Sequence, residues 1–338
     1  MHRFRLHAAE RMFCMKQTGQ KAPASWKRLT GVLATRQAKR NGFVLAVLLP
    51  FAAWMLVYML IPLASVIFYS FTNAKMAYDD FRFAGLYQFQ KLFSNSTARI
   101  AIWNTVKAAL IIMPISLALS VLTAAGLNAL SDRFRNLYTF VYFLPNIMSM
   151  TAVCLVWRWL YHDQYGIINA FLQLLGFPKQ QFLKSSSQAL ICLCVIHIWS
   201  IFGYYAVILL AAMRGIDKSL YEAADIAGAN SIQKFWYITL PMLKNTLLYV
   251  CIMLTTSAFM FFTPVKVLTD GTPGTSTMVM LLYIYQQGIW QGDVGYSSAM
   301  SLVLMGIILL FSLIQWVLTK ERKPKKIKAA AQKEAVQA

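Results

Sequence analysis

The residues most suited to chemistry form a short charged segment, residues 214–241, between two long apolar runs. It contains Tyr221-Glu222-Ala223-Ala224-Asp225-Ile226-Ala227-Gly228 and, ten residues after that glycine, Ile238-Thr239-Leu240-Pro241. Polar residues between membrane spans must lie outside the hydrocarbon, where a soluble protein can bind them. The chemistry that this segment predicts is therefore binding rather than catalysis. Two interpretations follow from its residues, a docking site for a partner and a helix lying on lipid.

The charged segment predicts two short amphipathic helices. Ser219 and Glu222 have the spacing of a capping box at the start of the first helix. An apolar stripe then follows at helical spacing, and Gly228 stands where a helix needs a left-handed stop. Ser231 is expected to cap the second helix. The stripe consists of Leu220, Ala223, Ala224 and Ala227.

The rest of the chain predicts no catalytic residue, no metal site and no cofactor bound by this chain. The four histidines are scattered, and all twelve acidic residues fall in expected loops or tails. His197 is expected to hydrogen-bond a neighbouring helix. Cys192 and Cys194 lie on different sides of a helix and are expected to pack as small apolar residues. No glycine-rich phosphate loop ending in Gly-Lys-Ser or Gly-Lys-Thr is present, so we expect no nucleotide site in this chain. A membrane enzyme would need paired carboxylates, a histidine cluster or an activated nucleophile at membrane depth, and because the expected spans offer none of these, we expect no enzyme.

The elements that position the charged segment are expected to be membrane-spanning helices. Of the 338 residues, 58% are hydrophobic and 13% are charged, against about 25% charged in globular proteins. The apolar runs reach the length of about 20 residues that a bilayer requires. The expected fold is all-α and polytopic, with one membrane domain at 43–319 between basic tails at 1–42 and 320–338. Six spans are expected, at 43–71, 102–128, 137–160, 188–213, 243–267 and 297–319.

The net charge of +20 reports orientation rather than nucleic-acid binding. Ten of the 32 Lys and Arg residues lie in 1–40 and seven in 320–338. With an even number of spans, both ends share one side, and the excess of basic residues places that side in the cytoplasm. Both termini are therefore expected to be cytoplasmic, with the tails attracted to anionic lipid.

The charged segment resembles the EAA loop of permease subunits from binding-protein-dependent ABC importers. The match is Glu222-Ala223-Ala224, Gly228 after three residues, and Ile238-x-Leu240-Pro241 after nine more. Other stretches are similar to the carbohydrate-uptake branch, of the maltose and glycerol-phosphate type. These are Trp103-Asn104-Thr105, Phe143-Leu144-Pro145-Asn146, Val156-Trp157-Arg158-Trp159 and Tyr283-Ile284-Tyr285-Gln286. The resemblance favours partner docking over a lipid-bound helix.

The resemblance implies the type I importer architecture, a location in the bacterial cell (inner or cytoplasmic) membrane, and a set of partners. These are a second permease, two cytoplasmic ATPase subunits that use ATP-Mg, and an external solute-binding protein. The helix from Leu220 would couple the permease to an ATPase, whose closure would move the spans and switch the cavity from inward-facing to outward-facing. The coupling residues implied are Leu220, Glu222, Ala223, Ala224, Asp225, Gly228, Leu240 and Pro241.

The same resemblance implies a sugar or oligosaccharide as the solute, recognised by aromatic faces and polar side chains. The candidate pathway residues are Phe259, Met260, Phe262, Thr263, Trp199 and Tyr204. Alternatives are a permease for glycerol-phosphate or amino acids, and an ion-coupled secondary transporter. The last would need acidic residues in mid-membrane, and the expected spans contain none.

Overall fold

The structure, a computed structural model, describes residues 46–76 and 82–319. The basic tails expected at 1–42 and 320–338 therefore lie outside the described residues. Residues up to Ser65 and residues from Val66 onward form two separate units. In the first unit, the described residues belong to the helix Ala46–Ser70, which contains a π-helical turn, η1, at Leu56–Leu60. Its apolar side chains are exposed, as expected of a membrane span.

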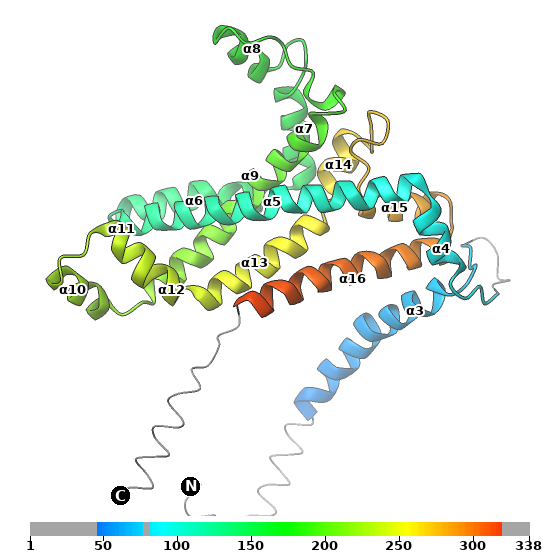
Figure 1. The fold of residues 1–338 in the computed structure, drawn as a ribbon, viewed down its shortest axis with the longest axis horizontal. Coiled ribbons are helices and arrows are strands. Elements are labelled where there is room, and N and C mark those ends of the chain that lie inside the picture. Colours follow the sequence, from blue (N-terminus) through cyan, green and yellow to red (C-terminus); the bar gives the residue numbers. More distant parts are fainter. Residues whose placement is uncertain (1–45, 77–81, 320–338) are drawn as a thin grey trace, which may run out of the picture. The chain divides into compact units, whose positions relative to one another are not determined.

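The second unit is a bundle of long apolar helices, so the all-α prediction is confirmed. Across the part of the chain that the structure describes, five helices are long and apolar enough to cross a membrane, one of them Ala46–Ser70, and a bent pair makes a sixth if it is one span. Three of the five are the uninterrupted helices α5, α9 and α16, and a fourth joins α13 to α14 (Figure 1). The elements are α3 (Ile61–Ser70), α4 (Tyr87–Ser94), α5 (Ser96–Ala129), α6 (Asp132–Ile147), α7 (Met150–Leu160), α8 (Ile167–Leu174), η2 (Phe182–Lys184), α9 (Ala189–Arg214), α10 (Lys218–Ile226), α11 (Ser231–Lys234), η3 (Phe235–Thr239), α12 (Leu240–Met242), α13 (Lys244–Phe259), α14 (Thr263–Leu268), α15 (Met280–Tyr285), η4 (Gln286–Trp290) and α16 (Val294–Thr319).

The span expected at 137–160 is a bent pair of helices rather than one continuous helix. The chain forms α6 and α7, which meet at a bend of 96° (Figure 1). Pro145 lies in the last turn of α6, where it removes a backbone donor, and Met148 is in an extended conformation. An apolar run is equally compatible with one helix or two, so length and hydropathy did not reveal the bend.

The core of the bundle forms where α5 and α9 pack on α13, α15 and α16. Small residues on α5, including Ala101, Ala108 and Ala109, are buried there and let the helices approach closely. Gly203 of α9 sits against the backbone of α6, since a Cβ at this position would lie 1.8 Å from the Tyr142 carbonyl oxygen. Cys192 and Cys194 are buried in the bundle, so their packing role is confirmed.

Polar groups on α5 fix the loop that leads into α15. The Asn104 amide donates to the carbonyl oxygens of Thr275 and Met278, at 3.1 and 3.0 Å. Thr105 Oγ1 accepts from the backbone N–H of Met280 at 2.7 Å. Both side chains are buried, where an unpaired polar group is costly. The Trp103-Asn104-Thr105 stretch therefore clamps a distant loop to the bundle.

Candidate functional site

Helix α10 starts and stops through local backbone contacts. Its N-cap is Asp217, whose carboxylate accepts from the Ser219 backbone N–H at 3.0 Å. This hydrogen bond lowers the pKa of Asp217. The predicted Ser219–Glu222 capping box is wrong, because the helix begins one residue before Ser219 and the shorter aspartate takes the capping position.

Gly228 ends α10 as predicted. Its φ of 76° lies in the left-handed region that side chains disfavour. The N–H groups of Gly228 and Ala229 then donate to the carbonyls of Asp225 and Ala224, at 3.0 and 2.9 Å. These two bonds form a Schellman motif, which closes the helix and turns the chain toward α11.

The second helix of the charged segment differs from the prediction. Asn230 caps it, not Ser231, and Asn230 and Gln233 form a reciprocal capping box. The chain then continues through α11 into the π-helical turn η3 and on to α12. Short π-helical segments inside helices occur frequently at functional sites.

The charged segment presents an apolar surface to solvent. No residue of α10 is buried, and Ile226 is 90% exposed. In the following elements, Ile232, Trp236 and Tyr237 are also exposed. Apolar side chains gathered on an exposed loop indicate an interaction surface.

Two side-chain contacts join α10 to the elements that follow it in the charged segment. Tyr221 Oη and Thr239 Oγ1 are hydrogen-bonded at 2.8 Å, and Tyr221 packs against the α5–α9–α13 core. Lys234 pairs with Asp225 across the turn. The structure therefore gathers Leu220, Glu222, Ala223, Ala224, Asp225 and Gly228 in one helix and its stop, whereas Leu240 and Pro241 lie in α12, next to α13.

A cavity of about 210 Å³ lies where two of the membrane helices are broken. One wall comes from the α6–α7 bend, another from the break between α13 and α14, and the third from α9. Irregular backbone at membrane depth is tolerated where it is buried in protein or lines a water-filled cavity. The cavity is lined by Pro145, Asn146, Met148, Met150, His197, Ser200, Ile201, Met260, Phe262, Thr263 and Pro264.

Three of the six candidate pathway residues line this cavity, namely Met260, Phe262 and Thr263. Phe259 is buried in the core, with its ring 5.1 Å from that of Phe311. Trp199 contacts Trp157, and Tyr204 stacks on Phe143; both lie on α9 away from the cavity lining.

His197 and Asn146 also line this cavity, and neither was predicted to do so. His197 Nε2 is 3.1 Å from Ser257 Oγ of α13, so the predicted hydrogen bond to a neighbouring helix is confirmed. Its Nδ1 is buried without a partner among the described residues. Pro145 was the signal available in the sequence, because a proline inside a span marks a break, which is tolerated where it is buried in protein or lines a water-filled cavity.

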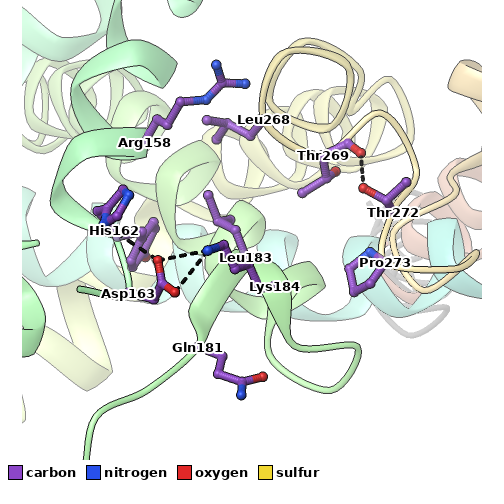
Figure 2. A pocket seen from close by; sticks show the side chains of 11 residues that line it. Arg158, His162, Asp163, Gln181, Leu183, Lys184, Leu268, Thr269, Thr272 and Pro273 are labelled. Carbon is purple, nitrogen blue, oxygen red and sulfur yellow. Dashed lines mark hydrogen bonds and ion pairs between the residues drawn. The ribbon is translucent and has the colours of Figure 1, made fainter. Parts of the chain in front are cut away.

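A second cavity, of about 370 Å³, lies between the loop after α7 and the loop after α14 (Figure 2). Lys184 donates to both carboxylate oxygens of Asp163, at 3.0 and 2.9 Å, and this pairing lowers the pKa of Asp163. The Arg158 guanidinium donates to the Val267 carbonyl at 2.6 Å, which ties α7 to α14.

Comparison with known families matches residues 116–323 to the family of binding-protein-dependent transport system inner membrane components. The chain belongs to this family. The matched region contains both the charged segment and the cavity at the helix breaks. This permease is thus a multi-pass membrane protein of a transport family rather than a member of an enzyme family.

Relatives of this permease are transport permeases. It is 31% identical to the arabinooligosaccharides transport system permease protein AraP of Bacillus subtilis (strain 168), over 78% of this chain and 84% of AraP. It is also 31% identical to the sulfoquinovosyl glycerol transport system permease protein SmoG of Agrobacterium fabrum, over 81% of this chain and 89% of SmoG.

Two solved structures share its fold. One is a bacterial ABC transporter involved in the import of the acidic polysaccharide alginate, with a TM-score of 0.74 and 22% identity. It matches 86% of this permease and 99% of the solved chain. The other is the alginate transporter in complex with an alginate pentasaccharide-bound periplasmic protein, with a TM-score of 0.72. The type I importer permease architecture is therefore confirmed.

Proposed function

We propose that this permease is one transmembrane subunit of an ATP-driven importer of sugars or oligosaccharides. The observation that carries the proposal is α10, an exposed helix with the EAA spacing, closed by Gly228 at φ 76° and bonded to the bundle through Tyr221. The relatives support a sugar substrate, because AraP and SmoG are named for arabinooligosaccharides and sulfoquinovosyl glycerol.

The partners in this proposal are a second permease, two cytoplasmic ATPase subunits and an external solute-binding protein. The permease would form half of the translocation pathway. The crystallised alginate transporter, which shares its fold, was captured with a periplasmic protein. ATP-Mg is used by the ATPase subunits, and this chain supplies the surface through which their motion is received.

Coupling would proceed through rigid contacts. An ATPase groove would bind the exposed Leu220–Gly228 face, with Glu222 and Asp225 supplying negative charge at its rim. Closure of the ATPase pair would move α10, and the Tyr221–Thr239 hydrogen bond would pass that motion to α13. Because α13 leads to the cavity at the helix breaks, the motion would change access to it, as alternating access requires.

The solute would pass the cavity formed by the α6–α7 bend and the α13–α14 break. Phe262 offers an aromatic face for the C–H surface of a sugar ring, whereas Thr263, Asn146 and His197 offer hydrogen-bonding groups. Trp199 and Tyr204 remain candidates for parts of the pathway completed by the second permease, whereas Phe259, which packs in the core, would support the helix that carries Met260.

The orientation in this proposal places both termini and the charged segment in the cytoplasm. Ion pairs between loops that are expected on the same side of the membrane support this orientation. Lys91 and Asp293, in two loops expected outside, form an ion pair at 2.8 Å. Asp132 and Arg214, expected inside, approach to 3.6 Å. The bacterial inner membrane is the location proposed.

The test is transport by the complex reconstituted in proteoliposomes, with ATP enclosed on the ATPase side and a panel of labelled sugars that includes arabino-oligosaccharides. We expect uptake that requires ATP, the binding protein and both permeases. A Met260→Trp variant, which fills part of the cavity, should reduce uptake while ATPase binding remains. Uptake by this chain alone, driven by an ion gradient, would show a secondary transporter instead. Uptake restricted to amino acids or glycerol-phosphate would reassign the substrate.

A further inference from the structure

An apolar groove of about 330 Å³ lies beside the charged segment, at the adjoining ends of α12, α13 and α16. Its walls are Leu240, Pro241, Leu247 and Leu248, with Cys251 deeper along α13. Lys244, the first residue of α13, and Thr319, the last of α16, complete the lining. We propose that this groove binds one anionic phospholipid, with an acyl chain along the apolar walls and the headgroup at Lys244.

The depth of the groove argues for a lipid. Both α13 and α16 are spans, so their ends adjoin the membrane surface, and the leucine walls extend from that surface into the hydrocarbon region. One turn above Thr319 along α16, the Gln315 amide donates to Thr255 Oγ1 of α13 at 2.6 Å. This bond joins the two helices that wall the groove.

The charge at this end argues for an anionic headgroup. In addition to Lys244, the sequence directly after Thr319 reads Lys320-Glu321-Arg322-Lys323-Pro324-Lys325-Lys326-Ile327-Lys328, with six basic residues among nine. Such a cluster next to a span is typical of attraction to anionic lipid, and each Lys or Arg contributes about fivefold in affinity. In the sequence, this basic run begins directly after Thr319, which lines the groove.

The experiment measures retained phospholipid by native mass spectrometry of the full-length chain, equilibrated with an equimolar mixture of phosphatidylglycerol and phosphatidylcholine. We expect one phosphatidylglycerol to be retained in preference to phosphatidylcholine. Lys244→Gln should weaken its binding about fivefold, and Lys244→Arg should keep it. The matched control is Lys218→Gln, in the charged segment but outside the groove lining, which should change nothing.

A second variant separates the groove from general surface charge. Leu248→Trp fills the apolar wall without changing charge and should remove the retained lipid. Ending the chain at Thr319 should weaken phosphatidylglycerol binding further. Equal retention of the two lipids, or equal effects of Lys244→Gln and Lys218→Gln, would overturn the proposal. More phosphatidylglycerol bound after the truncation would also overturn it, because the groove would then be filled by the tail of the chain. The result is independent of which solute the transporter carries.

Discussion

The hydroxyl of Tyr221 lies 2.8 Å from Oγ1 of Thr239, and this bond joins α10 to the π-helical turn that precedes α12 and α13. Thr239 is buried in η3, whereas no residue of α10 is buried. The exposed helix is thus connected to the membrane helices through a specific polar contact. Under the proposed function, force applied to α10 is transmitted at this point.

Tyr221→Phe should weaken coupling without preventing membrane insertion. The change removes one hydrogen bond, worth about 1 kcal/mol, and keeps the ring in its packing site. We expect ATP hydrolysis by the complex to be stimulated less by the loaded binding protein, and uptake per ATP to fall. Thr239→Val should have a similar effect, and the double variant should be no worse than either single one. Additive losses in this double-mutant cycle would show that the two hydroxyls act separately.

Gly228→Asp should abolish uptake and loosen ATPase binding while the protein remains in the membrane. A side chain at φ 76° costs about 1–2 kcal/mol and disturbs the Schellman motif that orients α10. Gly228→Asn should retain more function than Gly228→Ala, because asparagine tolerates the left-handed region better. Co-purification of the ATPase subunits measures the effect, and normal transport by Gly228→Asp would count heavily against the coupling role.

Glu222→Lys should also loosen ATPase binding, because it reverses a charge at the exposed rim of α10. Glu222→Gln, which removes the charge and keeps the shape, should give an intermediate loss. The defect should be largest at low salt, where charges interact over longer distances. The measurement is the dissociation constant for the ATPase across a salt series. An unchanged constant in Glu222→Lys would show that this side chain lies outside the interface.

Gly203→Ala should destabilise the bundle. The added Cβ would lie 1.8 Å from the Tyr142 carbonyl oxygen, so α6 and α9 would have to separate. Overpacking of this kind costs typically about 1–3 kcal/mol. The expected result is a lower midpoint of thermal unfolding in detergent. The matched control is Gly306→Ala in α16, where a Cβ meets no atom within 4 Å and no loss is expected.

The loop after α7 should depend on pH through Asp163. Lys184 lowers the pKa of Asp163, so the stabilisation by this pair is present above the ordinary aspartate pKa of about 3.9 and is lost as pH falls through the lowered value. Amide exchange in residues 161–187, corrected for intrinsic rates, should be faster in Asp163→Asn than in the wild type at neutral pH. The exchange rates of Asp163→Asn and the wild type should become equal at strongly acidic pH. At neutral pH, Lys184→Gln should exchange as fast as Asp163→Asn, and Lys179→Gln should exchange at the wild-type rate.

The sequence determined the features that depend on local chemistry. The lengths of the apolar runs predicted the spans, because a bilayer requires about 20 apolar residues in each helix. Gly228 predicted the end of α10, because glycine adopts a positive φ without a steric cost. The exact caps were less predictable. Asp217 and Ser219 both suit an N-cap. Because α10 begins at Lys218, Asp217 is the residue in the N-cap position.

Tertiary structure decided which distant segments meet. The sequence of 137–160 suits one helix or two, and packing of α6 against α9 at Gly203, together with the Arg158 bond to α14, accompanies the 96° bend. That bend brings Asn146 beside His197 and Thr263, from three separate helices, to line one cavity. Phe259, one residue before Met260, turns instead into the core. Hydropathy does not distinguish these two neighbours, since both are apolar. Whether such a side chain faces lipid, the core or a cavity is determined by the contacts of the folded bundle.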